Sequence, residues 1–269
     1  MRDSLSPETR EALVRAAHAA ADAARAPTLR HFRQGIGADD KGAAQGRYDP
    51  VTEADREAER AMREILARER PGDGILGEEY GPLGGTSGLT WVIDPIDGTR
   101  GYLCGTPTWG VLVAVRDRQG PLFGLIDQPY TGERFEGGLG RARLAGPAGE
   151  VALRTARGRR LSEARLLTTF PEIGTPAERA AFDRVAERVR LVRYGMDCYA
   201  YALLALGQVD LVIEAGLQPY DVAAPIAVVE AAGGLATDWD GGPAHEGGRL
   251  LAAADADLHA AALALLQGA

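Results

Sequence analysis

The sequence has few of the residues that indicate an extracellular or membrane protein. Only two of its 269 residues are cysteine, Cys104 and Cys198, which is too few for a disulfide framework and predicts a reduced, intracellular protein. No uninterrupted apolar run approaches the roughly 20 residues needed to cross a bilayer, and the N-terminus lacks the apolar segment of a secretory signal. We therefore expect a cytoplasmic protein with no membrane partner.

Basic residues are too few for a nucleic-acid-binding surface. The chain has 30 lysines and arginines against 38 aspartates and glutamates, a formal net charge of −8. A protein that binds nucleic acid needs a basic face, so the acidic balance predicts no nucleic-acid partner. Hydrophobic residues make up 45% of the chain, enough for one large core or two smaller ones. The question is whether some of the carboxylates are gathered to hold cations.

The first half is predicted to pack helices on a largely antiparallel sheet. Helices are expected over residues 7–32 and from Thr52 to about Pro71, separated by a glycine-rich stretch, residues 34–48, that is typical of a loop. Thr52 and Asp55 have the spacing of a capping box at the start of the second helix. Strand-like runs follow at residues 75–77, 90–93, 110–115, 122–126, 135–144 and 151–153.

In the second half, strands and helices alternate, which predicts an α/β layer with helices on both faces of its sheet. Strands are expected at residues 166–169, 191–194, 209–214 and 250–253, and helices at 176–189, 197–206, 221–232 and 257–267. A soft boundary near residue 155 divides the chain into an N-terminal α+β half, residues 1–155, and a C-terminal α/β half, residues 156–269. We expect the halves to pack together, because no low-complexity linker separates them.

One predicted strand, residues 90–93, ends in two aspartates within a stiff turn, Asp94-Pro95-Ile96-Asp97-Gly98. Proline has a fixed φ and no N–H, so it predicts that the strand cannot continue in a central ladder, and glycine lets the backbone turn. Two carboxylates at a strand end can converge on one hard cation such as Mg²⁺, which prefers oxygen ligands. The alternative, favoured for a lone Asp-x-x-Asp, is an Asx turn that only ends the strand.

Three further acidic segments lie at the ends of predicted elements. Glu78-Glu79 follows an apolar strand, Asp49 precedes a helix and Asp221 stands at the start of another helix. Each segment taken alone is explained as a helix cap or a solvated charge. Together with the 94–98 turn they make four acidic segments at element ends, where sites usually form.

These segments, in this order, resemble the inositol monophosphatase-like family of metal-dependent phosphatases. The resemblance runs from about Asp49 to Asp238, and its motifs are Gly77-Glu78-Glu79, Asp94-Pro95-Ile96-Asp97-Gly98-Thr99, and Asp221-Val222-Ala223-Ala224 followed by Gly233-Gly234. Within the family the chain is most similar to the histidinol-phosphate phosphatase branch, on residues 98–100, 124–129, 197–202 and 214–221. The resemblance implies a layered α-β-α-β-α sandwich of the inositol monophosphatase and fructose bisphosphatase type.

The resemblance also implies a metal centre with two to three Mg²⁺ ions. Glu78, Asp94 and the carbonyl of Ile96 would hold the first ion, and Asp94, Asp97 and Asp221 would hold the second. Metal coordination lowers the pKa of water, and a second ion neutralises the leaving alkoxide in an in-line displacement.

A third, weaker ion would be held by Glu78 through water, with Asp49 nearby. The catalytic residues implied are Glu78, Asp94 and Thr99, with Glu78 and Thr99 positioning and deprotonating the attacking water. Gly98 and Thr99 would contact the phosphate.

Substrate contacts are implied for Gly98, Thr99 and Asp221, and for three residues whose roles are less constrained: Arg100, Asp197 and Glu214. An aminoalcohol such as histidinol is positively charged, so a carboxylate at Asp197 or Glu214 suits it. The alternative for Asp197 is a cap on the helix that follows it. Arg100 is expected to pair either with the substrate or with a local acid.

The sequence thus predicts a Mg²⁺-dependent phosphomonoesterase, with histidinol phosphate as the first substrate and inositol monophosphate as the second. A nucleotide 3′-phosphate or a sugar bisphosphate ranks lower. The alternative of another class, a metal-binding homologue without activity, is disfavoured by the intact set Glu78, Asp94, Asp97, Thr99 and Asp221. By resemblance to the family, we expect a homodimer.

Overall fold

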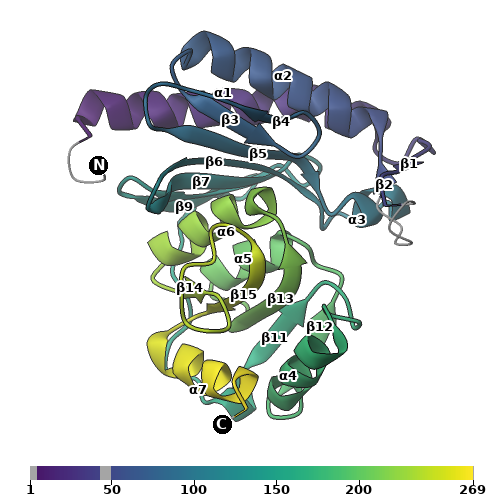
Figure 1. Cartoon of the computed structure of the whole chain (residues 1–269), viewed down its shortest axis with the longest axis vertical. Coiled ribbons are helices and arrows are strands. Elements are labelled where there is room, and N and C mark those ends of the chain that lie inside the picture. Colours follow the sequence, from purple (N-terminus) through teal and green to yellow (C-terminus); the bar gives the residue numbers. More distant parts are fainter. Residues whose placement is uncertain (1–4, 43–49, 269) are drawn as a thin grey trace.

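The computed structural model describes residues 5–42 and 50–268, and its two large sheets alternate with layers of helices (Figure 1). The helices are α1 (Pro7–His31), α2 (Glu53–Glu69), α3 (Thr99–Cys104), α4 (Pro176–Ala186), α5 (Tyr199–Ala205), α6 (Pro219–Ala231) and α7 (Ala256–Leu266). The first sheet has the order β10-β9-β8-β7-β6-β5-β3-β4, and the second has the order β12-β11-β13-β15-β14. This is the expected layered α-β-α-β-α sandwich.

The strands are short in the second sheet and longer in the middle of the first. Those of the first sheet are β3 (Gly74–Gly77), β4 (Gly81–Leu83), β5 (Thr90–Asp97), β6 (Gly110–Asp117), β7 (Gly120–Gln128), β8 (Glu133–Gly138), β9 (Arg141–Gly146) and β10 (Gly149–Ala152). Those of the second sheet are β11 (Arg165–Thr168), β12 (Leu191–Tyr194), β13 (Leu211–Leu217), β14 (Leu235–Thr237) and β15 (Gly248–Ala253). A separate pair is made by β1 (Asp39–Asp40) and β2 (Pro50–Val51).

Three apolar cores hold the layers together. Helices α1 and α2 cover the outer face of the first sheet, where Met62 packs in one core with Trp91 of β5. Helices α5 and α6 lie between the two sheets, and their residues share a core with strands of both. Helices α4 and α7 cover the outer face of the second sheet, with Phe182 and Leu258 in the third core.

One parallel pair in the first sheet brings two acidic segments to the same edge. Strands β3 and β5 run parallel, with Gly77 opposite Ile93, whereas β5 is antiparallel to β6 on its other side. The carboxyl ends of parallel neighbours meet at one edge of a sheet. The residues that follow, Glu78 and Asp94, are therefore delivered to the same place.

Helix α6 lies unusually close to the first sheet because glycines on the facing strands remove side chains from the contact. A Cβ on Gly124 of β7 would lie 2.7 Å from the Cα of Ala224, and one on Gly137 of β8 would lie 2.5 Å from the Cα of Val228. The helix that carries Asp221 is thus seated by direct contact between backbones.

The structure corrects several boundaries. Strand β5 does not end at Asp94: a bulge between Asp94 and Asp97 absorbs Pro95, and Asp97 pairs with Gly110 of β6. The run 135–144 is two strands, since the turn between them contains Leu139 in a left-handed conformation with φ of 50°. Short elements without a repeating pattern were not predicted, namely β1, β2, β4, α3, β14 and a single helical turn at Leu161–Glu163.

The predicted boundary near residue 155 lies between β10 and β11, and the division of the chain into two halves stays a prediction. Among the described residues, no helix is both long and apolar enough to span a membrane.

Candidate metal centre

Three of the predicted ligands form a compact cluster of carboxylates. Asp94 and Asp97 come from the bulged end of β5, and Asp221 comes from the first turn of α6. One carboxylate oxygen of each lies within 4.8 Å of the others. These residues are far apart in the sequence, so the cluster exists only because α6 is seated against the end of the first sheet.

The local turn and the cluster use the same side chains. The backbone N–H of Ile96 donates to Oδ1 of Asp94 at 3.0 Å, which is the Asx turn that the isolated motif predicts. The N–H of Gln218 donates to Oδ2 of Asp221 at 2.7 Å, as in a helix cap. The Asx turn at Asp94 and the helix cap at Asp221 are therefore both present, and the same two residues also belong to the cluster.

Glu78 lines the same cavity but stands outside the three-residue cluster. Its carboxylate pairs with the ammonium of Lys41 at 2.9 Å, and the same ammonium pairs with Glu79 at 2.8 Å. Glu78 still acts on the cluster, because its negative charge helps to raise the pKa of Asp94. Asp49, the residue expected near a third ion, lies outside the described residues.

The cluster concentrates negative charge around one buried carboxylate, that of Asp94, with Asp97 and Asp221 partly exposed. Burial raises the pKa of Asp94 well above its ordinary value, and the charges of Glu78, Asp97 and Asp221 raise it further. Burial likewise raises the pKa of Asp97, although the N–H of Cys198 donates to its carboxylate at 2.6 Å. Such a group of like charges is stabilised by a bound cation.

Thr99 follows the cluster at the start of α3, after Gly98, whose φ of 84° is left-handed. The Thr99 hydroxyl lies 3.1 Å from the carbonyl of Ile96 and 3.5 Å from Oδ1 of Asp55. Asp55 is fully buried at the start of α2, and burial raises its pKa to about 6. A hydroxyl with a buried carboxyl behind it is an arrangement that can pass on a proton.

Asp55 and Lys41 were not among the predicted site residues. Asp55 was explained by the capping box, and the structure confirms that role, since the N–H of Thr52 donates to its Oδ2 at 2.8 Å. The other oxygen is the one near Thr99. A capping motif has the same sequence whether or not the second carboxylate oxygen of its aspartate makes another contact. Lys41 lies in a stretch that was predicted only as a loop.

Two more carboxylates line the cavity on the side of the second sheet. Glu214 of β13 is 6% exposed and accepts hydrogen bonds from the N–H of Thr169 at 2.9 Å and the hydroxyl of Tyr201 at 3.0 Å. Burial raises its pKa to about 7. Burial also raises the pKa of Asp197 to about 6, against the opposing effect of the positive charge of Arg100.

The structure does not support the capping alternative for Asp197. Helix α5 begins at Tyr199 with Cys198 as its N-cap residue, and no side chain caps it. Asp197 instead lies against Gly98, where an added Cβ would come within 2.8 Å of its Cγ. Arg100 stacks on the ring of Phe170 at 4.8 Å and lowers the pKa of Asp197 by its charge, so it is close to a local acid.

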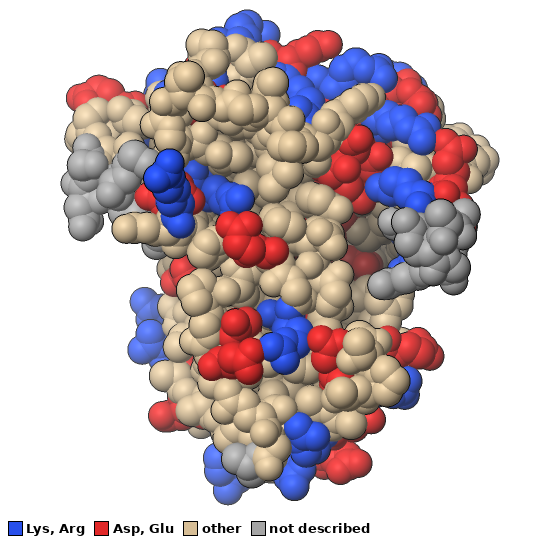
Figure 2. Space-filling model, viewed as in Figure 1, with Lys and Arg blue, Asp and Glu red and all other residues tan. Residues whose placement is uncertain are grey.

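These groups share one cavity of about 980 Å³ between the two sheets. Its lining includes Glu78, Asp94, Asp97, Gly98, Thr99, Arg100, Asp197, Glu214 and Asp221, together with the backbone-turn residue Ile96. Figure 2 shows a hollow between the upper and lower parts of the molecule, with both acidic and basic side chains beside it.

The chain is similar to known proteins of one family. The sequence model of the Inositol monophosphatase family matches residues 9–269. The chain is 40% identical over 262 residues to the bifunctional phosphatase IMPL2, chloroplastic, of Arabidopsis thaliana, covering 93% of this chain and 73% of that protein. It is 35% identical over 212 residues to a histidinol-phosphatase of Mycobacterium tuberculosis, covering 76% of this chain and 79% of that protein.

The chain belongs to the inositol monophosphatase family.

A solved structure of an inositol monophosphatase from Zymomonas mobilis has the same fold. It matches with a TM-score of 0.84 and 37% identity, covering 98% of this chain and 100% of that one.

As a member of the inositol monophosphatase family, the protein is a phosphatase that hydrolyses phosphoric monoesters. The family is metal-dependent, and the cluster of Asp94, Asp97 and Asp221 fits a divalent cation, because its donors are hard carboxylate oxygens close together.

Proposed function

We propose that the protein is a Mg²⁺-dependent phosphatase whose substrate is histidinol phosphate. The observation that carries this proposal is the pair of carboxylates, Asp197 and Glu214, in the same cavity as the cluster of Asp94, Asp97 and Asp221. A phosphate directed at the cluster would leave the alcohol portion near Asp197 and Glu214, where a positively charged amine is favoured. The histidinol-phosphatase name of the relative from Mycobacterium tuberculosis supports the same choice.

We assign two ions by the pattern of the resembling motifs. Glu78, Asp94 and the carbonyl of Ile96 would hold the first Mg²⁺, and Asp94, Asp97 and Asp221 would hold the second. The proximity of the aspartate oxygens supports the second site. A third ion would rely on Glu78 through water, with Asp49 nearby. When bound, these ions lower the pKa of water and neutralise charge on the leaving oxygen.

The residues of the chain orient the reactants and move the proton. Gly98 and the Thr99 hydroxyl would contact the phosphate, and the hydroxyl would also position the attacking water. Asp55, with a pKa of about 6 and Oδ1 3.5 Å from Thr99, would accept the proton that passes through that hydroxyl. Glu78 would orient the same water, and Asp94 would act through the metal ions that it holds.

Substrate contacts beyond the phosphate are proposed for four residues. Asp197 and Glu214 would bind the amine, and Arg100 would cover the substrate from its position on the Phe170 ring. Asp221 would contact the substrate near the ester oxygen. Inositol monophosphate is the second candidate, favoured by the likeness to the Zymomonas mobilis structure, which is described as an inositol monophosphatase.

A phosphate-release panel tests the proposed substrate. The purified enzyme with Mg²⁺ would be given histidinol phosphate, inositol 1-phosphate, fructose bisphosphate and a 3′-phosphonucleotide. We expect the highest kcat/KM on histidinol phosphate. A higher value on inositol 1-phosphate would replace the first candidate with the second.

The variant Asp197→Asn tests the reason for that choice. It removes negative charge near the proposed amine, so KM should rise roughly tenfold or more for histidinol phosphate, as expected for a charge-assisted hydrogen bond. The KM for inositol 1-phosphate should change little. Asp257→Asn, in the first turn of α7 on the outer face of the second sheet, is the matched control. Equal rises for both substrates would remove Asp197 from the amine site.

We also propose a homodimer in the cytoplasm. The family resemblance supports the dimer, and the two unpaired cysteines, Cys104 and Cys198, suit a reducing compartment. Light scattering should give twice the chain mass of 28.4 kDa, and a mass of one chain would refute the dimer.

A further inference from the structure

Helix α2 carries two buried carboxylates one turn apart, those of Asp55 and Glu59. Both residues are fully buried, and they face the same side of the helix because they are four positions apart. The Asp55 carboxylate caps the helix and lies near Thr99. A buried carboxylate is stable only where its oxygens accept hydrogen bonds. The partners of Glu59 therefore show what that side chain holds in place.

The partners of Glu59 lie mainly in the turn between β3 and β4, residues 78–80, which begins with Glu78. The backbone N–H of Glu79 donates to Oε2 of Glu59 at 2.7 Å, and the N–H of Tyr80 donates to Oε1 at 3.2 Å. The third donor is Nε of Arg63, at 2.7 Å from Oε1. Both carboxylate oxygens are thus bound to the backbone of the turn, which attaches it to α2.

Other residues of α2 fasten the same turn. The guanidinium of Arg63 donates to the carbonyl of Gly81, at the start of β4. Arg60 donates to the hydroxyl of Tyr80 at 3.1 Å, and that hydroxyl donates to the carbonyl of Arg56 at 3.3 Å. The turn is therefore held along its length by one face of the helix.

Gly77, directly before Glu78, leaves the space that the Glu59 carboxylate occupies. A Cβ added at Gly77 would overlap Oε1 of Glu59 and would lie 2.9 Å from the guanidinium of Arg63. Gly77 is not in the left-handed region, so a glycine is needed there for space and not for backbone conformation. Because Glu59 is fully buried, its side chain has no solvent into which it could move aside.

We propose that Glu59 is a positioning residue for the first metal ion, an inference that rests on the proposed assignment of Glu78 to that ion. The parallel pairing of β3 with β5 ends at Gly77, so the sheet does not hold the residues that follow. The Glu59 carboxylate holds the backbone just after Glu78 instead. It thereby fixes the direction in which Glu78 enters the cavity of the metal centre.

The variant Glu59→Gln tests the positioning role through metal binding. An amide has an NH₂ group in place of one acceptor oxygen, so at least one of the three donors loses its acceptor and the turn is loosened. The dissociation constant of the first Mg²⁺, measured by calorimetry on the full-length protein, should rise roughly tenfold or more, as for loss of an outer-shell partner. An unchanged dissociation constant would overturn the proposal.

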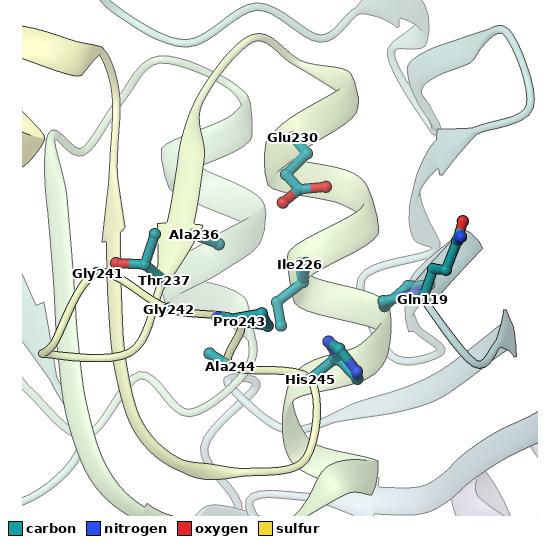
Figure 3. A pocket seen from close by; sticks show the side chains of 11 residues that line it. Gln119, Ile226, Glu230, Ala236, Thr237, Gly241, Gly242, Pro243, Ala244 and His245 are labelled. Carbon is teal, nitrogen blue, oxygen red and sulfur yellow. The ribbon is translucent and has the colours of Figure 1, made fainter.

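Two controls separate positioning from a general loss of stability. Asp210 is also fully buried, and its carboxylate accepts hydrogen bonds from the N–H and the Nε of Arg165, each at 2.9 Å. Asp210→Asn should lower the free energy of unfolding in EDTA, as Glu59→Gln should, but leave Mg²⁺ affinity unchanged. Glu230→Gln is the surface control, beside a cavity that shares no lining residue with that of the metal centre (Figure 3). Equal weakening of Mg²⁺ binding in Asp210→Asn and Glu59→Gln would overturn the proposal.

Gly77→Ala tests the same contact with every charge retained, and it carries the test if Glu59→Gln does not fold. The added Cβ displaces the Glu59 carboxylate, so Mg²⁺ should bind roughly tenfold or more weakly. In a Glu59→Ala background the carboxylate is gone, and the same substitution at Gly77 should have a much smaller effect. Effects that add in the double variant would overturn the proposal.

Glu78→Gln distinguishes failure of this inference from failure of the proposed metal assignment. As a change in the ligand itself, it should weaken Mg²⁺ binding more than Glu59→Gln does. Weak binding in Glu78→Gln with wild-type binding in Glu59→Gln would overturn the positioning role alone. Wild-type binding in Glu78→Gln would overturn the assignment of Glu78 to the first ion, and the positioning role with it.

Discussion

Asp94 combines a structural role and a chemical role in one carboxylate. It is 1% exposed, it accepts a hydrogen bond from the N–H of Ile96, and it belongs to the cluster with Asp97 and Asp221. An amide oxygen can accept the same backbone hydrogen bond, but it cannot supply the negative charge. The two roles can therefore be separated by a substitution of nearly the same shape.

Asp94→Asn should retain the fold and lose the activity. The turn keeps its hydrogen bond, while the cluster loses a charged ligand, so phosphate release should fall by more than the roughly 100-fold that loss of an outer-shell partner costs. Thermal unfolding without metal should not occur at a lower temperature than in the wild type, because a buried like charge has been removed. Substantial activity in this variant would contradict the assignment of Asp94 to the metal centre.

Glu214→Gln should change the pH dependence of stability. The pKa of Glu214 is about 7 in the folded protein and 4.5 as its ordinary value, so the folded state binds the proton more tightly than the unfolded state. The contribution of Glu214 to the free energy of unfolding of the metal-free wild type therefore decreases as the pH rises from 4.5 through 7. Glu214→Gln should be the more stable protein above pH 7, by up to ~3 kcal/mol.

Urea denaturation of the metal-free protein at pH 5 and pH 8 measures this effect. The exposed Glu64→Gln on α2 is the control, and its stability should follow the wild type at both values. A difference between Glu214→Gln and the wild type that is the same at pH 5 and pH 8 would contradict the shifted pKa.

At the scale of residues, the sequence predicted best the carboxylates that stand at a recognisable strand end or helix start. Asp94, Asp97 and Asp221 were predicted as ligands, and the structure brings them together. Asp55 could not be predicted in the same way, because its capping box already explained it. Only the folded arrangement shows that its second oxygen lies near Thr99.

At the scale of elements, the seating of α6 on the first sheet determines where Asp221 lies. Gly124→Ala would place a Cβ 2.7 Å from the Cα and 2.8 Å from the carbonyl oxygen of Ala224. Both are backbone atoms, so the helix must move, and overpacking of this kind costs about 1–3 kcal/mol. We expect a lower free energy of unfolding and a weaker affinity for Mg²⁺, measured by denaturation and by calorimetry.

Gly84→Ala is the matched control for the α6 contact. An added Cβ at Gly84 meets nothing within 4 Å, so stability and Mg²⁺ affinity should stay close to those of the wild type. If Gly124→Ala bound Mg²⁺ as the wild type does, the position of α6 would not limit the metal centre.

The elements that the sequence predicted are those with clear ends. Helix α2 begins at a capping box that the structure confirms, and the β6–β7 hairpin turns at Asp117 and Gly120 as expected. The strand through Pro95 was predicted to end too early, because a bulge that preserves the pairing of Asp97 with Gly110 leaves no mark in the pattern. Two-residue strands such as β1 are too short to show any alternation.

At the scale of the whole molecule, the metal centre links activity to stability. Chelation by EDTA should abolish phosphate release and lower the melting temperature, and added Mg²⁺ should restore both. A ligand at 100 times its dissociation constant stabilises the folded state by about 2.7 kcal/mol. Asp94→Asn should show little response to Mg²⁺ in the same melting experiment. Phosphate release that persists in EDTA would contradict a metal-dependent reaction.

The order of layers was expected from the family resemblance, whereas residue patterns alone gave only alternating elements. Nothing in the local pattern of β3 shows that it lies parallel to β5, although this pairing brings Glu78 to Asp94. Nor do the patterns show that α5 and α6 lie between the two sheets. These features depend on contacts between distant segments, such as Gly124 with Ala224.

The separation of Asp94 and Asp221 in the sequence also affects the rates of folding and unfolding. Asp94 and Asp221 meet only after α6 has docked on a completed sheet, so the cation has no full set of ligands while the chain is still folding. Interactions that are absent from the transition state slow unfolding without speeding folding. Bound Mg²⁺ should therefore lengthen the lifetime of the native protein and leave the rate at which it is first reached almost unchanged.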